Sequence, residues 1–318
     1  MRLSIPFLIV SVGLLSPPVA TFQAASPEEQ EIAILTIRQD KIRARTTAEL
    51  LPIARQAGGH FQAIAAELSE KQRSCPESRF RGSHGPGAKY DVFLGGLRIG
   101  EAIARRADVG AYSCSALCVV SAETTVKGNL GGRKDFRRGF DPTGNFEEDI
   151  TQFVALSPSS SRIEFRTVPV EPPSKMMRDS VARLVRTRLL KRRKPDAQTK
   201  VQLEDFRLFH STRAGALHAF VRAAREDTGH DEVKAMTAIV NIVGGRAAEV
   251  LLESVSEGNR YRGAANYEFV DAIDLNGDGR SEILVIYHDY EFHEFQFLRL
   301  TSGHGRYEVV HKGPTYGC

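Results

Sequence analysis

The stretch that decides the fold of this chain is residues 269–287, FVDAIDLNGDGRSEILVIY. Its first five residues, 269–273, and its last six, 282–287, are rich in β-branched, aromatic and other apolar side chains. The short loop between them is made of glycine, aspartate, asparagine and a few other residues. Two β-rich runs joined by a short glycine-containing loop predict an antiparallel β-hairpin.

The loop also has the spacing D-x-N-x-D-G-x-x-E, which is typical of a calcium-binding turn. Oxygen-bearing side chains at alternate positions of a tight loop converge on one point, and calcium takes six to eight oxygens at about 2.3–2.6 Å. Gly279 permits the sharp turn. The predicted calcium ligands are Asp274, Asn276, Asp278, the backbone carbonyl of Arg280, and Glu282. An Asx-rich turn that binds no ion is the alternative interpretation.

This calcium loop does not have the pattern of an EF-hand. An EF-hand needs a glutamate at the twelfth position and a helix after it, whereas Val285 stands there, inside a predicted strand. With a strand on each side, residues 269–287 resemble the FG-GAP/VCBS repeats, the calcium-binding hairpins of integrin α-subunit propellers and of many exported bacterial proteins. In that family the positions matched by Asp274, Asn276, Asp278 and Glu282 supply side-chain ligands, although the position of Glu282 is usually Asp.

The resemblance covers one hairpin out of 318 residues, and the family repeats such hairpins in several propeller blades. Residues 203–220 match only as a degenerate unit without its acidic loop. A full propeller needs at least four blades, whereas residues 199–318 have room for two or three four-stranded units. The resemblance therefore implies a partial-propeller or sandwich-like arrangement.

The rest of the C-terminal region repeats the β pattern. Short β-rich runs are separated by turn residues such as Gly244-Gly245 and Gly258-Asn259, which is typical of an antiparallel meander. The predicted strands are residues 201–209, 216–223, 235–243, 249–255, 267–273, 282–288, 292–300 and 307–311. We therefore expect a mainly β fold, α+β overall, built as an antiparallel β-meander with a helical N-terminal region.

The N-terminal half is more varied. Ser26-Pro27-Glu28-Glu29 has the composition of a helix start, so we expect two or three short helices over residues 26–73. Residues 90–100 contain Gly95-Gly96 between β-rich runs and predict a hairpin. Residues 118–120 and 163–170 are further strand candidates, and residues 128–149 are expected to form a long exposed loop. The predicted domains are 1–25 (signal peptide), 26–73, 74–170, 171–198 (basic helix and linker) and 199–318.

Charge is unevenly distributed along the chain. The net charge is only +4, but residues 175–194 carry nine basic residues and one acidic residue, while residues 195–318 carry 19 acidic and 13 basic residues. Apolar residues from Met177 to Leu189 recur at helical spacing, so we expect a basic amphipathic helix whose apolar stripe docks on the body. Contact with an anionic membrane surface is the alternative interpretation. The acidic C-terminal region and the expected export argue against nucleic acid as a partner.

The first residues are typical of an export signal. Arg2 precedes an apolar core at residues 5–15, and small residues such as Ala24 and Ala25 follow. The core is shorter than the roughly 20 residues that span a membrane. The four cysteines, Cys75, Cys114, Cys118 and Cys318, all follow this signal, and an even number in an exported chain predicts two disulfides. No second Cys pair or nearby His pair completes a zinc site.

No catalytic motif stands out. The chain contains no G-x-S-x-G sequence and no Trp. Asp289, Glu291 and His293 would share one face of a strand, where they could bind a metal or transfer protons, although a solvated strand edge is the commoner explanation.

A composition of 42% hydrophobic and 26% charged residues excludes a fibrous repeat and wholesale disorder. We therefore expect an exported, non-catalytic binding or structural module with one structural calcium ion and an unidentified protein or glycan ligand. The alternative is an exported hydrolase with its site in the loops near residues 128–149.

The export signal makes a direct prediction. The mature protein should begin between residues 20 and 26, because that is where small residues follow an apolar core of signal-peptide length. N-terminal sequencing of exported protein checks this. Recovery of chains that start at Met1 from the cytosol would contradict it.

Overall fold

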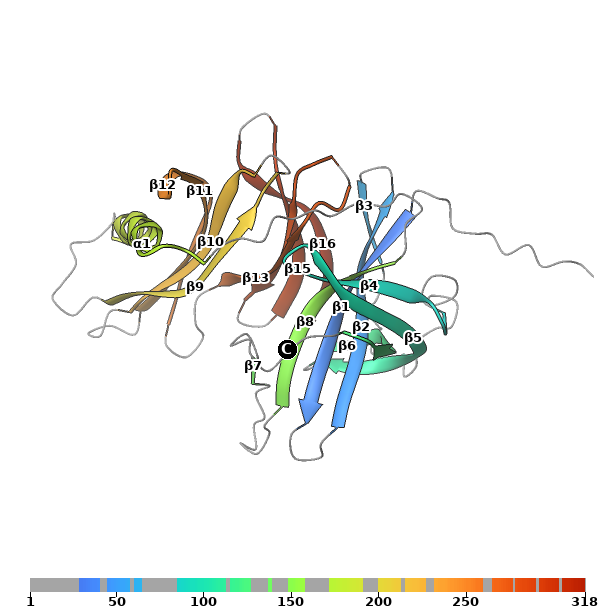
Figure 1. Cartoon of the computed structure of the whole chain (residues 1–318). Coiled ribbons are helices and arrows are strands. Elements are labelled where there is room, and N and C mark those ends of the chain that lie inside the picture. The colour runs from blue at the N-terminus through green and yellow to red at the C-terminus, as the bar shows by residue number, and fades with distance from the viewer. Residues whose placement is uncertain are drawn as a thin grey trace, which may run out of the picture.

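The structure is a computed structural model, and it describes fifteen segments of the chain. These are residues 29–40, 45–57, 60–64, 85–112, 115–126, 137–138, 148–157, 172–190, 200–212, 215–226, 232–259, 265–276, 278–289, 292–302 and 305–317. Within them lie sixteen β-strands and one α-helix, arranged as three antiparallel sheets (Figure 1). The predicted mainly β, antiparallel fold is therefore confirmed.

The first sheet closes on itself. Its ring consists of β1 (Glu29–Asp40), β2 (Arg45–Ala57), β6 (Ser115–Thr124), β5 (Leu97–Tyr112), β4 (Lys89–Leu94) and β8 (Glu148–Leu156). The ring is complete because β8 pairs with β4 on one side and with β1 on the other. The short strands β3 (His60–Ala63) and β7 (Arg137–Arg138) extend β2 and β8. We call this ring the closed sheet.

The predicted helices of the N-terminal region are wrong. Residues 29–40 and 45–57 form β1 and β2, which pair with each other along their whole length. Every residue from Gln30 to Ile37 is buried, because β1 has one face inside the closed sheet and the other against a neighbouring sheet. A strand buried on both faces has no alternation of apolar and polar residues, so its periodicity does not distinguish it from a buried helix.

The predicted hairpin at residues 90–100 is confirmed. Leu94 of β4 pairs with Leu97 of β5, leaving Gly95 and Gly96 as a two-residue turn. Both glycines have positive φ, 59° and 71°, as the tight turns of two-residue hairpins require. This turn sets the register of β4 against β5 and hence the positions of Tyr90 and Val92 inside the closed sheet.

The C-terminal region forms two four-stranded meanders. The outer sheet consists of β9 (Lys200–His210), β10 (Leu217–Glu226), β11 (Glu232–Val243) and β12 (Arg246–Asn259). The middle sheet consists of β13 (Asn266–Ile273), β14 (Glu282–His288), β15 (Phe292–Leu300) and β16 (Tyr307–Gly317). Each of the eight predicted strands of this region coincides with one of these elements, although the strand predicted at residues 216–223 begins one residue before β10. The two sheets pack face to face through a shared core that includes Phe220, Ile239, Ile283 and Val285.

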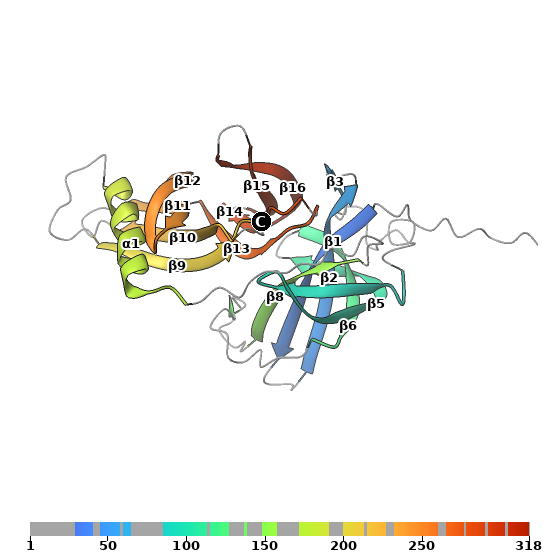
Figure 2. The same cartoon turned by 45° about the horizontal axis from the view of Figure 1, so that its top comes forward.

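The one helix among the described residues, α1 (Lys175–Leu189), covers the far face of the outer sheet (Figure 2). Ser174 caps its first turn by accepting a hydrogen bond from the Met177 N–H. Met177, Val181, Val185 and Leu189 are buried against the sheet, which confirms the predicted apolar stripe. In the described part of the chain, no helix has both the length and the apolar character needed to cross a membrane.

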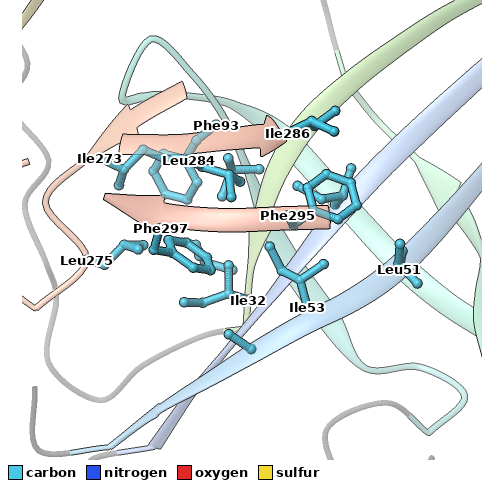
Figure 3. Packing of buried hydrophobic residues seen from close by; sticks show 14 of the residues in the cluster. Ile32, Leu51, Ile53, Phe93, Ile273, Leu275, Leu284, Ile286, Phe295 and Phe297 are labelled. Carbon is cyan, nitrogen blue, oxygen red and sulfur yellow. The ribbon is translucent and has the colours of Figure 1, made fainter. Parts of the chain in front are cut away.

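The layers therefore run from α1 through the outer sheet and the middle sheet to the closed sheet (Figures 1 and 2). The middle sheet is covered on both faces. Along β14, Ile283 and Val285 point toward the outer sheet, whereas Leu284 and Ile286 point toward the closed sheet. Figure 3 shows Phe295 and Phe297 of β15 beside Ile32 and Ile53 in the core that the middle and closed sheets share.

A cavity in this shared core should lower the free energy of unfolding. Phe297 is fully buried and stacks on Phe61 of β3, with 4.7 Å between ring centroids. Replacing Phe297 by alanine should lower the free energy of unfolding by about 3–5 kcal/mol. Val243, which is 61% exposed, serves as the control, and Val243→Ala should change that free energy by less than about 0.5 kcal/mol. Denaturant unfolding of both variants checks this, and equal losses would contradict the assigned core.

Candidate functional site

The acidic loop, residues 274–282, joins β13 to β14. The β13–β14 register shifts between Phe269 and Asp271, which is a β-bulge just before the loop. Because of this bulge, Phe269 and Ala272 both contact the core shared with the outer sheet, while Val270 and Ile273 contact the core shared with the closed sheet. The bulge therefore fixes the direction in which the chain enters the loop.

The side chains of the acidic loop fold back onto its own backbone. Asp274 Oδ2 accepts from the Gly279 N–H at 3.0 Å, Asn276 Oδ1 from the Asp278 N–H at 3.0 Å, and Asp278 Oδ1 from the Arg280 N–H at 2.8 Å. Asn276 Nδ2 also donates to Asp278 Oδ2 at 3.1 Å. Gly279 has a φ of 85°, which a side chain would strain. These successive turns place Asp274, Asn276 and Asp278 on one short stretch of loop.

Glu282 has different surroundings. It is 1% exposed, and its carboxylate accepts from the Leu275 N–H and from Arg299 Nε, both at 2.8 Å. Burial raises the pKa of Glu282 to about 7, while the Leu275 N–H and the Arg299 guanidinium act in the opposite direction. The Arg299 guanidinium in turn lies 5.4 Å from the ring centroid of Phe61. Glu282 is therefore linked through Arg299 to the strand β3 beside the closed sheet.

The acidic loop contacts the outer sheet as well. The Ser281 N–H donates to the Ser211 carbonyl at 2.9 Å, and Ser281 Oγ donates to the His210 carbonyl at 2.9 Å. Arg280 forms an isolated antiparallel bridge with Thr212. Leu275, which is 3% exposed, belongs to the core shared with the closed sheet. One loop of nine residues thus contacts all three sheets.

The predicted calcium ligands fall into two groups. Asp274, Asn276 and Asp278 carry the hard oxygen donors that calcium prefers and share one turn, so they fit the ion. Glu282 is buried and bonded to Arg299, so it fits better as a buried counter-charge than as an open ligand. Within the described residues, which omit Gly277 of this loop, no group of three or more His, Cys, Asp or Glu side chains is arranged to hold a metal ion. Calcium binding therefore stays a prediction.

The structure also brings together a buried polar network that the sequence did not reveal. His218 of β10 lies with Nε2 3.2 Å from Ser211 Oγ and Nδ1 3.0 Å from the Tyr307 hydroxyl. Tyr307 is 89 residues away from His218 in the chain, and no local motif marks their contact. A Ser–His pair oriented by a third group resembles a nucleophile and its base. Ser211 and His218 are only 1% and 3% exposed, so a substrate cannot reach the Ser211 hydroxyl in this arrangement.

The prediction that Asp289 and His293 share one face of a strand is wrong. The strand β14 ends at His288, and β15, which pairs with it, begins at Phe292. The close neighbours are instead His288 and His293, which pair across the two strands with their Nδ1 atoms 2.7 Å apart. Glu291 lies outside the described residues, and Asp289 is exposed.

Several predictions fall wholly or largely on residues that the structure does not describe. These are the signal peptide at residues 1–25, the strand at 163–170, the basic residues 191–194 and most of the loop at 128–149. Cys118 is fully buried in β6 and is disulfide-bonded. The other three cysteines lie outside the described residues, so the number and pairing of the disulfides stay predictions.

Comparison of the chain with protein-family models, with curated proteins and with solved structures yields no match. The assignment of function therefore rests on the residues and their contacts.

The buried network predicts a dependence of stability on pH. Burial lowers the pKa of His218 to about 4, from about 6.5 in an unfolded chain. Between these values the unfolded chain binds a proton that the folded chain does not, so the free energy of unfolding falls as the pH falls. The difference between the two pKa values corresponds to roughly 3 kcal/mol of stability present above pH 6.5 and lost by pH 4.

His218→Gln removes this titration. The variant should be less stable than the parent at pH 7.5, and the gap between them should narrow as the pH falls toward 4.5. The raised pKa of Glu282 acts with the opposite sign, but Glu282 is present in both proteins, so its direct contribution cancels in the difference. Urea unfolding of both proteins over this pH range measures the gap. A gap that stays constant with pH would contradict a buried, neutral His218.

Proposed function

We propose that this protein is an exported, non-catalytic binding or structural module, in which a calcium ion at the acidic loop stabilises the junction of three sheets. The observation that supports the proposal is the position of the loop. Leu275 lies in the core shared with the closed sheet, Ser281 Oγ donates to the carbonyl of His210 at the end of β9, and Glu282 pairs with Arg299 of the middle sheet. An ion that orders this one loop therefore acts on the contacts among all three sheets.

The donor set supports calcium as the ion. Asp274, Asn276 and Asp278 would hold it, together with the Arg280 carbonyl, and all of these are oxygen donors. Glu282 would contribute negative charge from behind the turn. A bound cation favours the ionised form of a neighbouring carboxyl group, so calcium would also strengthen the pairing of Glu282 with Arg299. The position of the loop between β13 and β14 supports the resemblance to the FG-GAP/VCBS hairpin, which remains part of the proposal.

The partner that fits this module is a protein or a glycan, not nucleic acid. The basic helix α1 is the other candidate contact surface, and its exposed face carries Lys175, Arg178, Arg183 and Arg186. The apolar stripe of α1 is buried against the outer sheet. The helix therefore has no second apolar face to insert into lipid. A docked surface helix explains these features, and contact with an anionic membrane remains the less favoured interpretation.

The alternative of an exported hydrolase places its site near residues 128–149. Most of that segment lies outside the described residues, so no contact of the structure favours it. The Ser211–His218 pair does not supply a substitute, because both side chains are buried in the core between the outer and middle sheets. We therefore favour the calcium-stabilised module over the hydrolase.

Calcium should raise the free energy of unfolding by a small amount. With a dissociation constant of about 10⁻⁴–10⁻³ M, as in extracellular modules, 1 mM calcium adds roughly 0.4–1.4 kcal/mol. Asp278→Asn keeps the size of the side chain but removes a charge, and it should abolish this calcium-dependent increase. Asp289→Asn, at an exposed position in a different hairpin, is the matched control and should leave the increase unchanged. Urea unfolding of the three proteins in calcium, and separately in magnesium, measures the ion-dependent increase in the free energy of unfolding.

Two outcomes would contradict the calcium proposal. If the parent protein gains no stability from millimolar calcium, the acidic loop is a polar turn without an ion. If Asp278→Asn and Asp289→Asn respond to calcium as the parent does, the ion binds elsewhere.

A further inference from the structure

A second candidate metal site lies at the opposite end of the β14 strand from the acidic loop. His288 is the last residue of β14 and pairs in register with His293 near the start of β15. Their rings are nearly perpendicular, at 73°, with centroids 4.6 Å apart. The two Nδ1 atoms are 2.7 Å apart. The two imidazoles therefore direct one nitrogen each toward a common point.

A carboxylate holds the first ring in place. Glu268 of β13 lies with Oε2 2.9 Å from His288 Nε2. Because a carboxylate only accepts hydrogen bonds, Nε2 of a neutral His288 carries the proton and Nδ1 carries the lone pair. His293 Nδ1 then supplies the proton that lies between the two nitrogens. In proteins, a metal-binding histidine commonly donates the N–H of its other ring nitrogen to a carboxylate, which fixes the orientation of the ring. Glu268 stands in this relation to His288.

We propose that His288 and His293 bind a divalent transition-metal ion, such as Zn²⁺ or Cu²⁺, through their two Nδ1 atoms, with Glu268 as the positioning residue. The metal takes the place of the proton between the rings. His288 keeps its proton on Nε2, and neutral His293 moves its proton from Nδ1 to Nε2 through solvent, so no net proton is released from the neutral pair. Two nitrogens at about 2.0–2.1 Å from one tetrahedral ion lie roughly 3.3 Å apart. From their present 2.7 Å, the two Nδ1 atoms therefore need to separate by about 0.6 Å, and the rings need to turn so that both lone pairs point at the ion.

The chemistry of this pair separates it from the acidic loop. Imidazole nitrogen suits zinc and copper, whereas carboxylate, amide and carbonyl oxygens suit calcium. The His288 and Glu268 side chains are 18% and 19% exposed, so an ion from solvent can reach them. Since no set of three or more His, Cys, Asp or Glu side chains in the described part of the chain is arranged around one ion, water or an added small ligand would complete the coordination. We expect copper to bind more tightly than zinc.

Calorimetric titration of the tag-free full-length protein with ZnCl₂, and separately with CuCl₂, tests the proposal. One ion should bind per chain. His293→Gln should lower the affinity by 100-fold or more, because it removes one of two nitrogens. Glu268→Gln keeps both nitrogens and should lower the affinity by about 10–100-fold, as loss of an orienting carboxylate does. His60→Gln, at an exposed position in β3, is the matched control and should bind as the parent does.

A measurement on the parent protein guards against misfolded variants. The nine histidines can be followed by nitrogen NMR. Zinc should shift the Nδ1 signals of only two of them, and calcium should shift neither. The proposal is overturned if neither ion binds more tightly than millimolar, or if the shifted signals do not belong to His288 and His293. It is also overturned if well-folded His293→Gln binds both ions with the affinity of His60→Gln.

Discussion

Burial of both faces of the middle sheet is the constraint on which the rest of the structure depends. In β14, Ile283 and Val285 contact the outer sheet, while Leu284 and Ile286 contact the closed sheet. Each fully buried side chain of this kind contributes about 1.5–3 kcal/mol relative to exposure to water. A sheet that is apolar on both faces needs a layer on each side. The outer sheet covers one face, and the outward-facing residues of β1 and β2 cover the other.

The acidic loop lies where these layers meet, and its chemistry follows from that position. Glu282 and Arg299 form an ion pair in which the Glu282 side chain has no exposed surface. Removing charges from water is costly, so such a pair is kept only where its hydrogen bonds are well satisfied. Here the Leu275 N–H satisfies one carboxylate oxygen and Arg299 the other. A calcium ion on the exposed side of the loop would therefore act electrostatically on the Glu282–Arg299 pair. Through Arg299, this pair connects the middle sheet to Phe61 of β3.

The strands of residues 199–318 were predictable from sequence, and the N-terminal strands were not. Each C-terminal strand is a short β-rich run between turn residues, so local preference and tertiary structure agree. Just before β1, Ser26-Pro27 has the composition of a helix start, whereas the pairing of β1 with β2 and β8 makes residues 29–40 a strand. The turn that holds Asp274, Asn276 and Asp278 was predictable because its residues are neighbours in the chain. The Arg299 partner of Glu282, the His218–Tyr307 contact and the His288–His293 pair depend on strand pairing and sheet packing, which spacing along the chain does not reveal.

If the acidic loop joins the three sheets, as we propose, the loop and the sheets unfold as a single cooperative unit. Native-state hydrogen exchange tests it most directly. The Leu275 and Ser281 amides, which donate to Glu282 and to Ser211, should exchange with the same free energy and denaturant dependence as amides of β1, β10 and β14. That result requires the loop and all three sheets to open together. If the loop amides exchange through small local openings while the three sheets open at different denaturant concentrations, the loop does not join them and the account is contradicted.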